Sequence, residues 1–211
     1  MEEQLSRIGE YRRENPNRLT KEQLDALEQE LRHPQKGIIS DEYLDYKFWC
    51  QGLPSRQECF AAYLRDEVLP SRKLHILEVG SGRYARLSVL LTEMGHRLTC
   101  MDPGAEPVED AEIEVRREAF HYENVDLKDY DFVVAQEPCD ATEHIVRACS
   151  SQQVSFVMVL CGVPHKRIGG GMPEDVYAWY AYLAGIDPLH TRLDYVKLYP
   201  KMSVAVIRNE D

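Results

Sequence analysis

Short apolar runs alternate with helix-like patterns from residue 75 onward, and this alternation constrains the fold more than any other feature. Apolar runs typical of strands cover residues 75–79, 97–101, 113–117, 131–135 and 154–160. Between the first two runs, Leu87, Leu90 and Leu91 recur at helical spacing. Strands that alternate with helices predict a parallel sheet covered on both faces, which is a doubly wound α/β fold.

The last two apolar runs, residues 192–199 and 203–208, predict a closing hairpin. Only Pro200, Lys201 and Met202 connect them, and this connection is too short for a crossover between parallel strands. We therefore expect a mostly parallel seven-stranded sheet with a C-terminal antiparallel hairpin.

The first seventy residues show no strand pattern. Apolar residues recur at helical spacing here, as at Leu24, Leu27 and Leu31. We expect a helical N-terminal extension over residues 1–70, acting as a lid or as a packing layer, followed by a Rossmann-like domain over residues 71–211. The extension carries aromatic residues that either pack in a core or roof a ligand pocket, namely Tyr43, Tyr46, Phe48 and Trp49.

The negative charge of the chain is concentrated in one segment. Lys and Arg number 25 against 36 Asp and Glu, for a net charge of −11. Residues 102–143 contain 14 acidic and 3 basic residues and account for the whole excess. Phosphate backbones are bound by clustered Lys and Arg, and no such cluster is present, so nucleic acid is disfavoured as a partner. Negative potential attracts cations, which favours a cationic or neutral substrate.

Membrane insertion, secretion and disulfide bonds are also disfavoured. The longest apolar run, residues 154–163, covers ten residues, whereas a membrane span needs about twenty. The charged N-terminus lacks the apolar stretch of a secretory signal, so we expect a cytoplasmic protein. Six cysteines form no C-x-x-C pair, and we expect reduced, mostly structural thiols.

A glycine bend between the first strand and the next helix marks the candidate cofactor site. It reads Glu78-Val79-Gly80-Ser81-Gly82. Glycines allow a tight turn against which a ligand can lie, and the following helix points N–H groups at that ligand. Asp102 ends the second strand, where a carboxylate can accept hydrogen bonds from ribose hydroxyls. We predict that a nucleoside-containing cofactor is bound by Glu78, Gly80, Ser81, Gly82 and Asp102.

The bend also fits the dinucleotide pattern G-x-G-x-x-A, so NAD(P) or FAD and an oxidoreductase activity remain open. Three features favour a different cofactor. Glu78 places an acidic residue near the end of the first strand, and the acidic segment beyond Asp102 would repel a pyrophosphate. The closing hairpin is not a second mononucleotide-binding half.

These features resemble the class I S-adenosylmethionine-dependent methyltransferases over residues 73–208. In that family an acidic-x-Gly-x-Gly motif matches residues 78–82, the residue matching Asp102 binds the ribose, and an antiparallel seventh strand closes the sheet. The resemblance implies that residues 71–211 bind S-adenosylmethionine, with Glu78 near its amino group, and transfer the methyl group to a small-molecule or peptide acceptor. The chain departs from the family at Tyr84, where a third glycine is frequent, and around the third strand, where the usual helices are reduced or missing. A non-catalytic methyltransferase-like binding protein is a further alternative.

The first candidate catalytic residue follows the fourth strand. Glu137 lies in Gln136-Glu137-Pro138-Cys139-Asp140, which resembles only loosely the N-P-P-Y corner of amine methylases. Glu137 could hold an amine substrate or influence the protonation state of that amine. The alternative is that Pro138 and Asp140 only start a helix, for which Asp140 and Glu143 form a capping pair.

The second candidate, His165, follows the fifth strand. Its imidazole could accept a proton from a hydroxyl or an amine near pH 7, or His165 could be a surface residue without a chemical role. Cys161 and His165 together could suggest a nucleophile pair or a metal site. The sequence shows no second ligand cluster, so we expect no metal.

Overall fold

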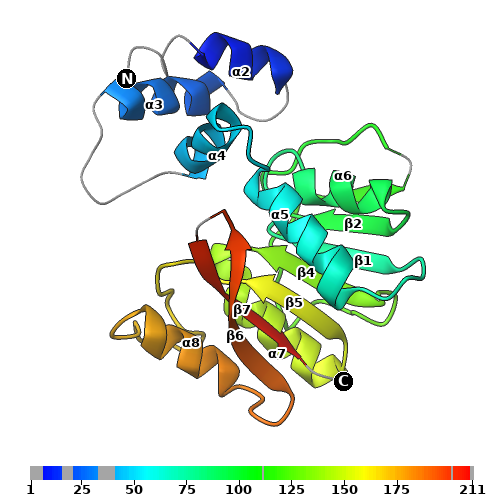
Figure 1. Cartoon of the computed structure of the whole chain (residues 1–211). Helices are drawn as coiled ribbons and strands as arrows, with labels where there is room; N and C mark the ends of the chain where they lie inside the picture. The colour runs from blue at the N-terminus through cyan, green and yellow to red at the C-terminus, as the bar shows by residue number, and fades with distance from the viewer. Residues whose placement is uncertain (1–6, 16–20, 33–40, 111, 201, 210–211) are drawn as a thin grey trace. The chain divides into compact units, whose positions relative to one another are not determined.

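The chain divides into two units between Cys59 and Phe60, and each unit is described by itself. The computed structural model describes residues 7–15, 21–32, 41–110, 112–200 and 202–209 (Figure 1). The helix α5 (Arg56–Tyr63) spans the division and continues into a π-helical segment, η1 (Leu64–Val68).

Within the described residues of the first unit lie three further helices, α2 (Ile8–Glu14), α3 (Lys21–Arg32) and α4 (Asp41–Cys50). The leucines of α3 are buried in a small core with residues of α2 and α4. The ring of Tyr11 lies 5.1 Å from the rings of Tyr46 and Trp49. Tyr46 and Trp49 are therefore packing residues of this unit.

In the part of the chain that the structure describes, seven strands form one sheet in the order β3-β2-β1-β4-β5-β7-β6 (Figure 1). The strands are β1 (His75–Val79), β2 (Arg97–Met101), β3 (Ile113–Arg116), β4 (Phe132–Gln136), β5 (Ser155–Val159), β6 (Thr191–Tyr199) and β7 (Met202–Asn209). The first five strands are parallel, whereas β7 pairs antiparallel with both β5 and β6. The predicted sheet with its closing hairpin is confirmed.

Helices lie on both faces of this sheet. α7 (Thr142–Gln152) and α8 (Val176–Ala184) pack on the face that carries Leu77, Val133 and Phe156, and this interface is the main core. The helix α6 (Arg86–Glu93) lies on the opposite face, because its Ser88 contacts Glu78, which alternates with Leu77 along β1. The predicted doubly wound arrangement is therefore confirmed.

One predicted helix start is wrong. Asp140 does not cap α7, because residues Cys139–Ala141 form a separate 3-10 helix, η2, and Ala141 precedes α7 without a side-chain cap. The last helix begins at Val176, where the side chain of Asp175 accepts a 2.8 Å hydrogen bond from Ala178 N.

The connection between β3 and β4 lacks a helix, as the departure from the family predicts. Residues 117–131, all described, form turns and irregular structure. An open groove of about 830 Å³ lies beside this connection, with Met101, Arg116 and Tyr130 among its lining residues. None of the predicted site residues lines this groove.

Two other expectations concern membrane spans and thiols. Among the described helices, none is both long enough and apolar enough to cross a bilayer. All six cysteines are described and none of them forms a disulfide; three of them, Cys100, Cys149 and Cys161, are buried.

Candidate functional site

The structure brings the predicted site residues to one edge of the sheet. Residues 78–82 end β1, Asp102 follows β2, Glu137 follows β4 and His165 follows β5. These four strands are parallel neighbours, so their carboxyl ends lie at the same edge. In open α/β sheets this edge is where ligands bind.

Asp102 fastens the glycine bend to the end of β2. Its Oδ2 accepts a hydrogen bond of 3.0 Å from Gly82 N, and its Oδ1 accepts one of 2.7 Å from Gly104 N. An ionised carboxylate offers about four acceptor positions. The half-buried carboxylate is therefore held in place and keeps capacity for further donors, such as ribose hydroxyls.

The two glycines of the bend meet different surroundings. Both have left-handed backbones, with φ of +71° at Gly80 and +67° at Gly82. A Cβ at Gly80 would lie 3.0 Å from the Cα and Cβ atoms of Pro138, whereas a Cβ at Gly82 would meet no atom within 4 Å. Gly80 therefore permits the close approach of the corner after β4, while the space at Gly82 is open and not filled by Tyr84.

Glu78 is buried beneath α6, with 3% of its surface exposed. Its carboxylate accepts a hydrogen bond from the hydroxyl of Ser88. Burial raises the pKa of Glu78 to about 7, the Ser88 hydrogen bonds oppose this shift, and the charge of Asp102 adds to it. The predicted place of Glu78 near the cofactor's amino group stays a prediction. Sequence analysis missed Ser88, although it is a polar residue between Leu87 and Leu91 on the buried face of α6.

Ser81 makes a local contact within the bend. Its hydroxyl donates a 3.3 Å hydrogen bond to the carbonyl oxygen of Gly82. The side chain is half-buried, and its role in cofactor binding also stays a prediction.

The corner after β4 has an unusual backbone. Glu137 and Cys139, which flank Pro138, have φ of +54° and +51°. A left-handed conformation costs a non-glycine residue about 1–2 kcal/mol, and such strained residues cluster at functional sites. Glu137 N donates to the carbonyl of Val159 at 2.9 Å, which ties the corner to the end of β5.

His165 is paired with Asp140 across two loops. Its Nδ1 lies 3.3 Å from Oδ1 of Asp140, and its side chain is 15% exposed. The other ring nitrogen, Nε2, is buried without a hydrogen-bond partner in the described part of the chain. Asp140, predicted as a helix cap, is instead an exposed partner of this imidazole.

Glu143 also departs from its predicted capping role. Its buried carboxylate accepts hydrogen bonds from Ile168 N at 2.7 Å, Tyr182 Oη at 2.7 Å and Arg147 Nε at 2.8 Å. These bonds connect the loop after β5 to α7 and α8. Glu143 is therefore a positioning residue for the loop that carries His165.

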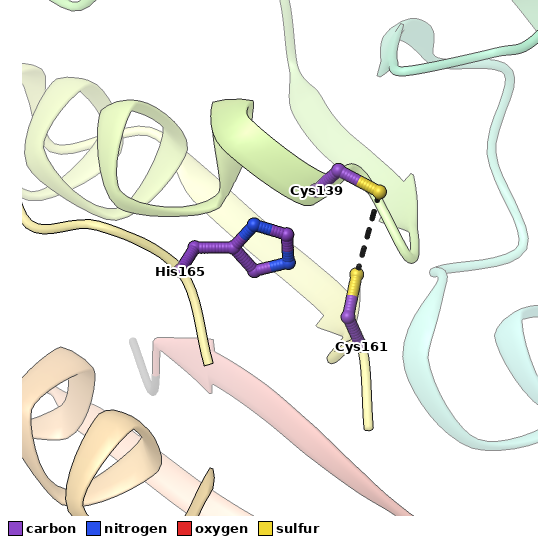
Figure 2. A group of neighbouring side chains, drawn as sticks. All are labelled: Cys139, Cys161 and His165. Atoms are coloured by element: carbon purple, nitrogen blue, oxygen red, sulfur yellow. Dashed lines mark hydrogen bonds between the residues drawn. The ribbon is translucent and has the colours of Figure 1, made fainter. Parts of the chain in front are cut away.

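Sequence analysis named Cys161 and His165 but missed Cys139. Figure 2 shows Cys139, at the start of η2, facing Cys161, which follows β5. Their sulfur atoms are 3.8 Å apart. The available signal was positional, because each cysteine lies within three residues of the end of its strand and β4 and β5 are neighbours in the sheet.

Comparisons with known proteins give structural neighbours only. No family model and no curated protein matches the sequence. Among solved structures, a TehB-like SAM-dependent methyltransferase from Corynebacterium glutamicum is 18% identical, with a TM-score of 0.44 over 78% of this chain and 93% of that chain. Precorrin-6y C5,15-methyltransferase from Geobacter metallireducens is 15% identical, with a TM-score of 0.46 over 72% of this chain and 88% of that chain. Ribosomal protein L11 methylase from Lactobacillus delbrueckii is 12% identical, with a TM-score of 0.43 over 72% of this chain and 76% of that chain.

The fold rests on the strand order and not on these distant similarities. The sheet has five parallel strands, and β7 lies antiparallel between β5 and β6. A glycine bend follows β1. This chain has a Rossmann-like fold, with the closing antiparallel strand that the resemblance to the class I S-adenosylmethionine-dependent methyltransferases predicts.

Proposed function

We propose that this protein is an S-adenosylmethionine-dependent methyltransferase that acts on a small-molecule or peptide acceptor. The observation that carries the proposal is the position of Asp102. Its carboxylate is held by Gly82 N and Gly104 N at the end of β2, beside an open glycine bend. A glycine bend with a neighbouring acidic residue is the arrangement that nucleoside recognition requires.

The charges around the bend favour a cofactor without phosphate. Glu78 and Asp102 are close enough for the charge of Asp102 to raise the pKa of Glu78. The nearby Arg83 forms an ion pair with Glu106. A pyrophosphate would meet the negative carboxylate of Asp102, whereas S-adenosylmethionine carries a positive sulfonium and a positive ammonium. NAD(P) or FAD is therefore the weaker alternative.

When bound, S-adenosylmethionine supplies a methyl group on an electrophilic sulfonium. Methyl transfer is an in-line displacement, and placement of the nucleophile alone can supply up to roughly 7–11 kcal/mol. In this proposal the cofactor is held by Glu78, Gly80, Ser81, Gly82 and Asp102. Glu137 orients the acceptor, and His165, paired with Asp140 at Nδ1, accepts a proton at Nε2.

The charge of the acceptor stays a separate prediction. Several carboxylates of the acidic segment are paired with cations from elsewhere in the chain, including Glu106 with Arg83 and Glu112 with Lys73. These pairs reduce the negative field at the site. Glu137 is the carboxylate we propose to face a cationic or neutral acceptor.

Calorimetric titration with S-adenosylhomocysteine tests the cofactor assignment. Replacement Asp102→Ala removes charged hydrogen bonds of about 1.5–3 kcal/mol, so we expect affinity to fall roughly ten- to a hundredfold. Asp126→Asn is the matched control, because Asp126 Oδ1 accepts a hydrogen bond from the N–H two residues later, at Lys128, as Asp102 does at Gly104. This control should bind like the wild type.

Other results would contradict the proposal in distinguishable ways. Equal affinity of the wild type and Asp102→Ala would refute the ribose assignment. Thermal stabilisation by NADH but not by S-adenosylhomocysteine would select the oxidoreductase. No heat with either ligand would select the non-catalytic binding protein.

A further inference from the structure

We propose that Cys139, Cys161 and His165 form a binding site for a thiophilic divalent cation, with Zn²⁺ as the preferred ion and one coordination position open. Their ligand atoms all lie within 4.8 Å of one another. Figure 2 shows the three residues coming from separate segments, with the imidazole extending toward the two sulfur atoms.

The spacing of the sulfur atoms fits tetrahedral zinc. With Zn–S distances of about 2.3 Å, two thiolates of a tetrahedral site lie about 3.8 Å apart. The Sγ atoms of Cys139 and Cys161 are 3.8 Å apart. A Zn–N distance of about 2.0–2.1 Å places the imidazole nitrogen about 3.6 Å from each sulfur. The ligand atoms already lie within 4.8 Å of one another, so the ring needs a shift of at most about 1 Å. A disulfide would require the sulfurs to approach to about 2.05 Å.

The two nitrogens of His165 are placed as in a metal-binding histidine. Such a histidine binds the metal through one nitrogen and directs the other to a carboxylate, which fixes the ring. Here Nδ1 faces Asp140 at 3.3 Å, and Nε2 is buried without a partner in the described residues. A cation between the ring and the sulfurs supplies the missing partner of Nε2.

The two sulfur atoms are neighbours and can both reach one cation. A bound cation would displace the thiol protons, because zinc takes thiolates. Cys139 is exposed and gives the ion a path of entry.

The backbone on both sides of the site is anchored. Tyr180 Oη donates a 2.7 Å hydrogen bond to the carbonyl of Cys161. Thr142 Oγ1 donates one of 2.7 Å to the carbonyl of Cys139. Both anchors lie outside the ligand set, so they hold the sulfurs near one another whether or not an ion is bound.

The open position distinguishes this site from a structural zinc site. Structural sites close with four protein ligands, whereas catalytic sites keep three and leave one position to water or substrate. This edge of the sheet also carries Glu137. A metal at Nε2 would prevent His165 from accepting a proton there, so the two proposed roles of His165 exclude one another. The metal site requires no S-adenosylmethionine and leaves the proposed cofactor site unchanged, but it replaces the proton-accepting role proposed for His165.

The test is titration of the reduced full-length protein with Co²⁺ and Zn²⁺. We expect one Co²⁺ per chain, with sulfur-to-cobalt charge-transfer absorption and the visible bands of tetrahedral coordination, lost on addition of Zn²⁺. Cys139→Ser, Cys161→Ser and His165→Gln should each weaken Zn²⁺ binding at least about a hundredfold. Asp140→Asn should weaken it about tenfold, as removal of an outer-shell partner does.

Matched controls separate the site from ordinary thiols and imidazoles. Cys59→Ser and His190→Gln should bind as the wild type does, since His190 pairs with Asp187 at 3.0 Å much as His165 pairs with Asp140. Cys139 is exposed, so Cys139→Ser should fold, which its thermal transition verifies. Absence of stoichiometric Co²⁺ binding after reduction, or binding unaffected by Cys139→Ser and His165→Gln, would overturn the proposal. Calorimetry with S-adenosylhomocysteine on metal-free protein reports on the cofactor site separately.

Discussion

Glu78 is a buried ionisable residue that lies in β1, next to the proposed cofactor site. Its side chain is almost fully enclosed and contacts Ser88 of α6. A carboxylate in such surroundings is disfavoured relative to the neutral acid. Protonation of this one residue therefore links stability to pH.

The first prediction concerns this linkage. The folded protein keeps the Glu78 proton up to about pH 7, whereas the unfolded chain loses it near the ordinary pKa of 4.5. Stability from this group is therefore present below pH 4.5 and is lost as pH rises to about 7, by roughly 3 kcal/mol in total. Glu78→Gln cannot titrate. Urea unfolding at several pH values should show that the free energy of unfolding of the wild type falls by this amount relative to that of Glu78→Gln as pH rises. If the two free energies changed with pH in the same way, the raised pKa of Glu78 would be contradicted.

At the scale of elements, the loop after β5 is held by a carboxylate from a helix. Glu143 lies in the first turn of α7, and its carboxylate accepts hydrogen bonds from Ile168 N of the loop and from Tyr182 Oη of α8. The adjacent Arg147 supplies the compensating charge. This explains how a loop with three consecutive glycines, Gly169–Gly171, holds His165 in one place.

The second prediction tests this anchor. Glu143→Gln keeps the shape of the side chain but removes its charge, so the charged hydrogen bonds weaken and unfolding free energy should fall by about 1.5–3 kcal/mol. The N–H of Ile168 should exchange with solvent faster than in the wild type. Glu114→Gln removes a carboxylate from the exposed pair with Arg116 and should change stability by less than about 1 kcal/mol. Equal stability of Glu143→Gln and wild type would exclude the anchoring role.

At the scale of the whole molecule, the sheet and its main core belong to one unit. The seven strands that the structure describes lie within residues 60–211. The core beneath α7 and α8 is formed by residues of this second unit. The second unit therefore contains the apolar interfaces that a cooperative fold requires.

The third prediction follows from this division. A fragment starting at Pro54 keeps the whole of α5 and the complete sheet, so it should unfold in a single cooperative thermal transition. Gradual loss of structure would show that the helical unit is required for folding. Binding of S-adenosylhomocysteine by the fragment, compared with the full chain, then distinguishes the proposed lid role of the N-terminal residues from packing alone.

The sequence was sufficient to predict the strands and their order of appearance, and it placed the candidate site residues after strands that share one edge of the sheet. Apolar runs and helical spacing are local signals, and the short connection at Pro200 dictates an antiparallel hairpin. The glycine bend and Asp102 could be placed together because the carboxyl ends of neighbouring parallel strands share one edge.

The side-chain partners could not be predicted in this way, because they depend on contacts between segments far apart in the chain. The hydrogen bond from Ser88 to Glu78 depends on how α6 packs on the sheet. The contact between Asp140 and His165 depends on the path of the loop after β5. The left-handed backbones at Glu137 and Cys139 have no signal in residue type. They set the direction of Cys139 toward Cys161, so only the packed chain shows that two separate thiols and one imidazole are neighbours.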